Sequence, residues 1–126
     1  MKNIPTVEWS PMERGREKTS WQGRFGEYGS FRVDYYFSSD EVEVLYIGSY
    51  EPLQSWTNGG RQKLGKHYGV TRWKDEGEDA TEFAFRYGAQ TVETAKHQVA
   101  LRGGFEVGLL KALTLRFGEI VGRLRR

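Results

Sequence analysis

Residues 31–48, FRVDYYFSSDEVEVLYIG, contain two runs in which apolar and polar side chains alternate. The apolar sets are Phe31, Val33 and Tyr35, and then Val42, Val44 and Tyr46. A period of two residues is typical of a β-strand with one buried face. The polar residues 38–41 between the runs have the composition of a turn. The stretch therefore predicts an antiparallel hairpin whose second strand ends at Gly48.

The sequence on either side of this hairpin predicts an irregular arm and a short helix. Residues 1–28 combine two prolines and three glycines with mixed charges, so we expect an irregular N-terminal arm. A loop is expected around Pro52 and the glycines before Arg61. Residues 61–68 predict a short basic helix.

The second half of the chain predicts a third strand and two helices. Phe83, Phe85 and Tyr87 alternate with polar residues, which favours a strand over residues 81–87. Residues 92–100 and 105–117 each carry an apolar stripe at helical spacing. We therefore expect an α+β fold with a small three-stranded antiparallel central sheet flanked by helices. The arm would span residues 1–28 and a single domain residues 29–126.

Size and composition place the chain among small intracellular proteins. Its 126 residues suit one domain, and 14% aromatic residues can fill a core. It has no cysteine, so neither disulfides nor thiolate metal sites are expected. No apolar run approaches the roughly 20 residues that span a bilayer. We expect a cytoplasmic protein without a membrane partner.

Charge is distributed unevenly along the chain. Residues 1–60 carry six Lys or Arg and nine Asp or Glu, whereas residues 61–126 carry thirteen and eight. Residues 59–74 contain no acid, and they include the aromatic residues Tyr68 and Trp73. This composition is typical of a nucleic-acid contact, although a solvated charged surface has the same composition. The candidate contact residues are Lys63, Lys66, Arg72 and Lys74.

A tyrosine strand followed by Tyr46-Ile47-Gly48, a basic helix, a third strand and an acidic helix resembles the GIY-YIG nuclease domain. The resemblance covers about residues 30–117. The first half-motif falls on Val33-Asp34-Tyr35, where only the tyrosine is kept, or one residue later. Ten residues, 36–45, then separate the half-motifs, which is the spacing that the family uses.

The resemblance implies a set of catalytic residues. Tyr35 and Tyr46 would orient or deprotonate the attacking water, and Arg61 would clamp the phosphate. His67 would act as an auxiliary acid or base, or as a hydrogen-bond donor to the phosphate. Glu106 would bind the metal, Mg²⁺ or Mn²⁺, with Glu93 as the alternative carboxylate. The family spacing puts the arginine position at Trp56, so Arg61 requires a longer loop.

The function that this resemblance implies is a small metal-dependent endonuclease acting on DNA. So small a domain offers limited surface for reading a long site, so selective cleavage would be compatible with a homodimer or a separate specificity partner. The alternative is a catalytically inactive nucleic-acid-binding or protein-binding regulator on the same scaffold, of the kind found in viruses and mobile elements. The degenerate first half-motif and the displaced arginine favour this alternative. A third reading is an interaction domain in which a partner extends a sheet edge.

Overall fold

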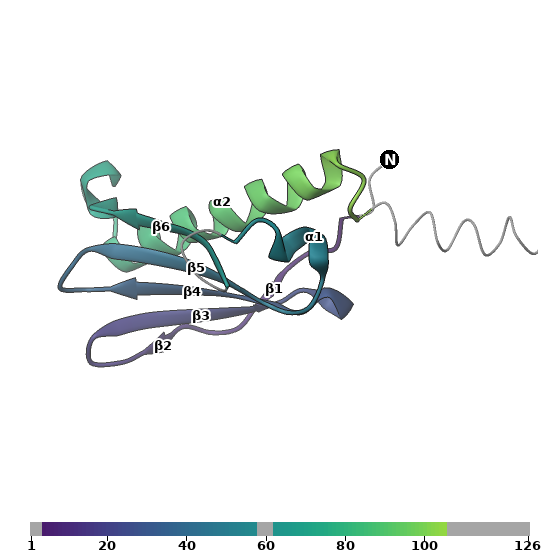
Figure 1. The fold of residues 1–126 in the computed structure, drawn as a ribbon. Coiled ribbons are helices and arrows are strands. Elements are labelled where there is room, and N and C mark those ends of the chain that lie inside the picture. Colours follow the sequence, from purple (N-terminus) through teal and green to yellow (C-terminus); the bar gives the residue numbers. More distant parts are fainter. Residues whose placement is uncertain (1–3, 58–61, 106–126) are drawn as a thin grey trace, which may run out of the picture.

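A computed structural model describes residues 4–57 and 62–105, which form a six-stranded antiparallel sheet with a long helix packed across one face (Figure 1). The strand order is β1-β3-β4-β5-β6, and β2 also pairs with β3. The strands are β1 (Glu8–Trp9), β2 (Glu13–Arg14), β3 (Lys18–Arg24), β4 (Ser30–Tyr36), β5 (Glu41–Ile47) and β6 (Lys63–Tyr68). The helices are the 3₁₀ turns η1 (Gly26–Tyr28) and η2 (Val70–Trp73), the short α1 (Glu51–Gln54) and the long α2 (Ala80–Leu101).

The predicted hairpin is confirmed as β4 and β5. Seven residue pairs join the two strands, from Ser30 opposite Ile47 to Tyr36 opposite Glu41. The alternating apolar residues of both strands are buried, and α2 packs against both strands; the buried residues are Phe31, Val33, Tyr35, Val42, Val44 and Tyr46. The hairpin therefore forms the centre of the sheet, as the alternating pattern of residues 31–48 predicted.

The α+β class is confirmed, but the prediction of three strands is wrong because the described residues form a sheet of six. Residues 1–28 were expected to be irregular, yet their described part contributes β1, β2 and β3. Strand β3 pairs with the whole of β4, and its alternate residues Thr19, Trp21 and Gly23 are buried. Threonine and glycine weaken this alternation in the sequence, so the strand was missed.

Two further predicted elements have the opposite secondary structure. The segment expected to be a helix, residues 61–68, contains the edge strand β6, which pairs with residues 41–45 of β5. The expected third strand, residues 81–87, is the first part of α2. Phe83 and Tyr87 lie one helical turn apart, and Phe85 faces Trp9 and Trp21 at centroid distances of 5.1 and 5.0 Å. The aromatic residues lie on two sides of the helix but occur at every second position of the sequence, which is why this segment was predicted to be a strand.

Helix α2 begins with a well-formed cap and extends over 22 residues. The Asp79 carboxylate accepts hydrogen bonds from the backbone N–H groups of Thr81 (2.9 Å) and Glu82 (3.1 Å). Its first predicted apolar stripe, at residues 92–100, is confirmed, since Val92, Ala95, Val99 and Ala100 are buried. The helix ends at Leu101, two residues before the pair Gly103-Gly104.

The chain closes the core beyond α2 with one aromatic side chain. Phe105 is fully buried, and its ring contacts those of Phe25 (5.2 Å), Tyr28 (5.3 Å) and Tyr50 (5.6 Å). The rest of the second apolar stripe, residues 106–117, lies outside the described residues, so that helix stays a prediction. Within the described ranges, no helix combines the length and the apolar character that crossing a membrane requires.

The distance between α2 and the sheet is set by a glycine. A Cβ atom added at Gly88 would lie 2.5 and 3.0 Å from the two methyl groups of Val33, in the middle of β4. Carbon atoms in contact are normally 3.5–4.0 Å apart, so no larger residue fits at this position without movement. The absence of a side chain at Gly88 allows the helix to pack directly on the central strand.

We expect Gly88→Ala to lower the free energy of unfolding by ~1 kcal/mol. Overpacking costs ~1–3 kcal/mol, and the better helix propensity of alanine offsets ~1 kcal/mol of it. Urea denaturation would measure the change. A Gly88→Ala, Val33→Ala double variant is the matched control, because removal of the valine methyl groups should make the two losses less than additive. If the single variant Gly88→Ala were more stable than the unmodified protein, the close contact between position 88 and Val33 would be contradicted.

Candidate functional site

The two tyrosines predicted to activate water lie far apart on the same buried face. Tyr35 pairs with Val42, and Tyr46 pairs with Phe31. Four residues along the strands separate these pairs, which corresponds to about 13 Å. Both side chains are buried, with 5% and 1% of their surface exposed. The structure therefore does not bring the Tyr35 and Tyr46 hydroxyl groups together.

The Tyr46 hydroxyl is fully engaged in holding the chain at the end of β5. It donates a hydrogen bond to the Tyr28 carbonyl and accepts one from the Tyr50 N–H at 3.0 Å. A Cβ atom at Gly48 would lie 2.6 Å from that same Tyr28 carbonyl and would overlap the Tyr46 hydroxyl. The Tyr-Ile-Gly sequence thus has a structural role, since Gly48 leaves room for the tyrosine to bond back to the backbone.

The Tyr35 hydroxyl belongs to a different cluster, at the turn between β4 and β5. It donates to the Asp40 carboxylate at 2.9 Å, and the same carboxylate accepts from the Thr71 N–H (3.2 Å) and the Thr71 hydroxyl. The Val70 N–H donates to the Asp40 carbonyl at 3.3 Å. Asp40 adopts the left-handed conformation, with φ of 52°, which a short polar side chain tolerates. This residue therefore fixes η2 to the central hairpin.

Burial, and then the hydrogen bond to Asp40, raise the pKa of Tyr35 to about 12. Burial also raises the pKa of Tyr46 above its ordinary value. A tyrosine acts as a general base only when its pKa is lowered toward the working pH. These environments therefore oppose the predicted catalytic role of the two tyrosines.

Two of the predicted catalytic residues, Arg61 and Glu106, lie outside the described residues. Their roles as phosphate clamp and metal ligand stay predictions. No group of three or more acidic, histidine or cysteine side chains that could hold a metal ion occurs in residues 4–57 and 62–105. The alternative carboxylate, Glu93, is half-exposed on α2 and pairs with Lys96 at 2.7 Å. The predicted Mg²⁺ or Mn²⁺ site thus depends on a residue that the structure leaves undescribed.

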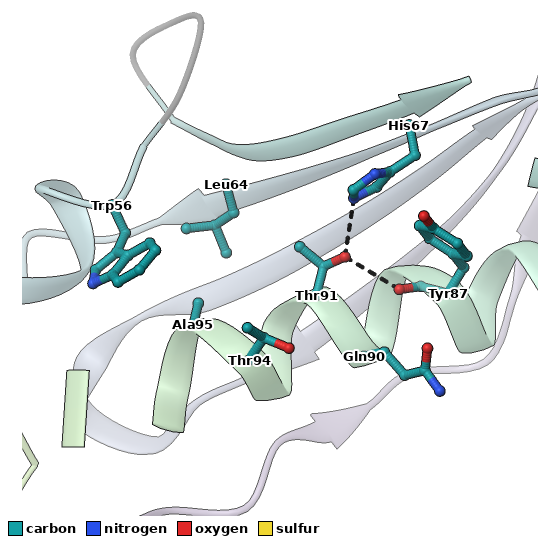
Figure 2. A pocket seen from close by; sticks show the side chains of 8 residues that line it. All are labelled: Trp56, Leu64, His67, Tyr87, Gln90, Thr91, Thr94 and Ala95. Carbon is teal, nitrogen blue, oxygen red and sulfur yellow. Dashed lines mark hydrogen bonds between the residues drawn. The ribbon is translucent and has the colours of Figure 1, made fainter. Parts of the chain in front are cut away.

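His67 lies in a hollow between β6 and α2. Its Nε2 atom is 3.2 Å from the Thr91 hydroxyl, and its ring meets that of Tyr87 edge-on at 4.6 Å. Burial lowers the pKa of His67, so the ring is neutral at neutral pH. Figure 2 shows His67 and Tyr87 facing the same side of the hollow, with Trp56 at its other end. Of the predicted catalytic residues Tyr35, Tyr46 and His67, which the structure describes, His67 lines this hollow, whereas the two tyrosines are buried.

Two of the four predicted nucleic-acid contacts, Lys63 and Lys66, form ion pairs with acidic residues of the sheet. Lys63 pairs with Glu43 at 3.3 Å and Lys66 pairs with Glu41 at 2.8 Å, both on the neighbouring strand β5. The two glutamates lie at least twenty residues before the lysines in the sequence, so only the structure shows that they are close to the lysines. The charges of these two lysines are therefore partly neutralised by glutamates, and they are less available to bind a phosphate than the sequence suggested.

The other two basic residues, Arg72 and Lys74, flank an exposed aromatic side chain. Trp73 is 70% exposed and Tyr68, at the end of β6, is 62% exposed. Neither Arg72 nor Lys74 forms a salt bridge with another described residue. Tyr68, Arg72, Trp73 and Lys74 together form what we call the β6–η2 surface.

The residues that sequence reasoning missed are those that support this surface. Asp40 looked like an ordinary turn residue, and its bonds to Thr71 join segments 31 positions apart. Gln90 and Thr91 line the hollow because residues 81–87 are helical rather than extended. The helix signal was present in the sequence, since Asp79 three residues before Glu82 is a capping pattern.

No protein-family model matches this sequence, and neither a curated protein nor a solved structure matches it significantly. The resemblance to the GIY-YIG domain therefore stays a sequence-based prediction.

We expect the free energy of unfolding to fall as the pH rises from about 10 to about 12. An unfolded tyrosine ionises near pH ~10, whereas folded Tyr35 keeps its proton to about pH 12. The unfolded state thus binds fewer protons in this window, so alkaline pH favours unfolding. Urea denaturation at several pH values would measure the slope. Tyr35→Phe should flatten the slope, and an identical slope in that variant would contradict the assignment.

Proposed function

We propose that this protein binds single-stranded nucleic acid, with DNA as the first candidate, through the β6–η2 surface and without cleaving it. The observation that carries the proposal is the exposure of Tyr68 (62%) and Trp73 (70%) within a segment that holds basic residues and no acid. Aromatic rings among cations are the usual means by which proteins hold unpaired strands.

The exposed rings supply the part of binding that is independent of sequence. Every base has a flat π-face, and stacking on an aromatic side chain contributes ~1–3 kcal/mol per base. Leaving a tryptophan 70% exposed forfeits the stabilisation that its burial would give, which supports a binding role for Trp73. Arg72 and Lys74, on either side of it, are positioned to contact phosphates.

The attachment of η2 prepares the surface for binding. The Asp40 carboxylate and carbonyl together bond to Val70 and Thr71, the first two residues of η2. Trp73 ends that same turn. Because the backbone is already fixed, binding would not need to order this segment, and affinity increases when such ordering costs are avoided.

The charge of the surface predicts a shallow dependence of affinity on salt. Lys63 and Lys66 are paired with acids of β5, which leaves Arg72 and Lys74 as the cations of the segment that form no salt bridge among the described residues. Two phosphate contacts on a single strand give a slope of about −1.4 in a plot of log affinity against log salt concentration. Stacking would therefore contribute a larger share of affinity than charge does.

DNA hydrolysis stays a prediction that rests on the sequence pattern. The tyrosine hydroxyl groups that would serve it are bonded within the protein, whereas Arg61 and Glu106 fall outside the described residues. Binding and hydrolysis call for separate experiments, because a surface that holds a strand need not contain a catalyst.

We expect Trp73→Ala to weaken binding of a fluorescently labelled DNA strand about tenfold, because one stacked base is lost. The salt slope should not change, since no phosphate contact is removed. Arg72→Ala should instead reduce the slope by about 0.7. Fluorescence anisotropy at several salt concentrations would measure both quantities.

The matched control for Arg72 is Arg24→Ala, an exposed cation on β3 that pairs with Glu8 at 2.7 Å. It should leave both affinity and slope unchanged. If the unmodified protein does not bind DNA, the proposal is overturned, and the hypothesis of a protein-binding regulator remains.

We expect no cleavage when the protein is incubated with DNA and Mg²⁺ or Mn²⁺, because the Tyr46 hydroxyl is bonded to Tyr28 and Tyr50. Gel electrophoresis of a labelled substrate would measure the products. Cleavage that is lost in Glu106→Ala would instead establish the hydrolytic function. Cleavage that survives in both Glu106→Ala and Tyr46→Phe would place the catalyst elsewhere.

A further inference from the structure

A hollow of about 360 Å³ lies between the edge strand β6 and the middle of α2 (Figure 2). Leu64 and His67 contribute from the strand and Trp56 from the loop after α1; the helix contributes Tyr87, Gln90, Thr91, Thr94 and Ala95. This volume is near the lower end of the range for ligand sites, ~300–1,000 Å³. Its contents would therefore be small, about the size of one ring system with its substituents.

The walls of the hollow combine flat apolar surface with side chains that can form hydrogen bonds. Trp56, Leu64 and Tyr87 are partly exposed and supply the apolar surface. Gln90 and Thr94 are exposed, and their polar atoms bond to no other side chain or backbone group among the described residues. An amide and a hydroxyl group left free beside aromatic surface suit a planar ligand that has donors and acceptors along its edge.

His67 is fixed in the wall by a chain of hydrogen bonds. The Thr91 hydroxyl donates to the Tyr87 carbonyl at 3.2 Å, so its oxygen is left to accept from His67 Nε2, also at 3.2 Å. This arrangement holds the imidazole against Tyr87 in one orientation. The site is therefore rigid on the side where strand and helix meet, which favours recognition of one shape.

The hollow adjoins the β6–η2 surface. His67 lines the hollow and Tyr68, the next residue of β6, belongs to that surface. Successive side chains of a strand point to opposite faces, so the two sites lie on either side of the same sheet edge. A strand of nucleic acid that passes this edge can reach both sites.

We propose that the hollow takes one unpaired base of the bound strand, with Gln90 and Thr94 bonding to the edge of the base. This inference rests on the proposed function, because the β6–η2 surface would deliver the strand. Unpaired bases are commonly read by stacking on aromatic rings together with hydrogen bonds to their edges. Gln90 is the principal specificity residue, since an amide can form two hydrogen bonds with one base.

An extended peptide added to β6 fits the observations less well. The edge carries Lys63 and Lys66, and the pairing of β5 with β6 is interrupted by a bulge at Val44 and Leu45. Lysines and bulges are features that discourage further strand pairing at a sheet edge. The hollow beside the edge is therefore better explained by a ligand that does not continue the sheet.

The test compares homopolymeric DNA strands of adenine, cytosine and thymine by fluorescence anisotropy. We expect the unmodified protein to prefer one of the three strands. Gln90→Leu, which keeps the size of the side chain, should weaken binding of the preferred strand about tenfold and reduce the discrimination. The salt slope should stay the same, because phosphate contacts are unaffected. Thr94→Val should show a smaller loss in the same direction.

His97→Gln is the matched control, because this residue is exposed on α2 and lines a different hollow with the N-terminal segment. It should leave affinity and preference unchanged. Circular dichroism would verify that each variant folds. Equal affinity for all strands, unaltered by Gln90→Leu, would overturn the base site and leave the proposed function standing. Absence of binding to every strand would overturn both.

Discussion

The direct contact between Gly88 of α2 and Val33 of β4 determines how the other parts of the molecule are arranged. It brings the helix against the central hairpin, and the remaining strands extend the sheet on both sides of that contact. Strand β3 lies on one side, where Phe85 contacts Trp9 and Trp21. Strand β6 lies on the other side, where α2 and the sheet edge separate enough to leave the hollow around His67. The core and the candidate site are thus two consequences of the same packing distance.

The hairpin was predictable because its two strands are neighbours in sequence and each has one buried face. Local alternation is enough to specify such a unit. The long helix was harder to recognise, since Phe83, Phe85 and Tyr87 repeat every second residue while serving two sides of α2. Strand β6 gave no clear local signal, because its stability comes from pairing with β5 and from the diagonal ion pairs of Lys63 and Lys66. Tertiary contacts of this kind override local propensity.

In the candidate site, too, the sequence predicted the local composition but not the tertiary contacts. The basic, aromatic composition of residues 62–74 was visible in the sequence, and Tyr68 and Trp73 are exposed in the structure. The partners that neutralise two of the lysines were not visible, because Glu41 and Glu43 come from another strand. The Tyr-Ile-Gly motif has a structural explanation that needs no substrate. Gly48 makes room for a tyrosine that bonds to the backbone, so the short motif alone cannot distinguish a catalyst from a buried corner.

Position 40 is subject to two requirements that no single residue satisfies best. The left-handed backbone at Asp40 favours glycine, which adopts this conformation without steric cost. The attachment of η2 requires a carboxylate that reaches Thr71, which glycine does not have. Aspartate meets the second requirement at the expense of the first. The turn therefore gives up some local backbone stability, and in return a segment more than thirty residues away is held in place. Substituting glycine at position 40 would relieve the backbone, but it would also remove the carboxylate that attaches η2.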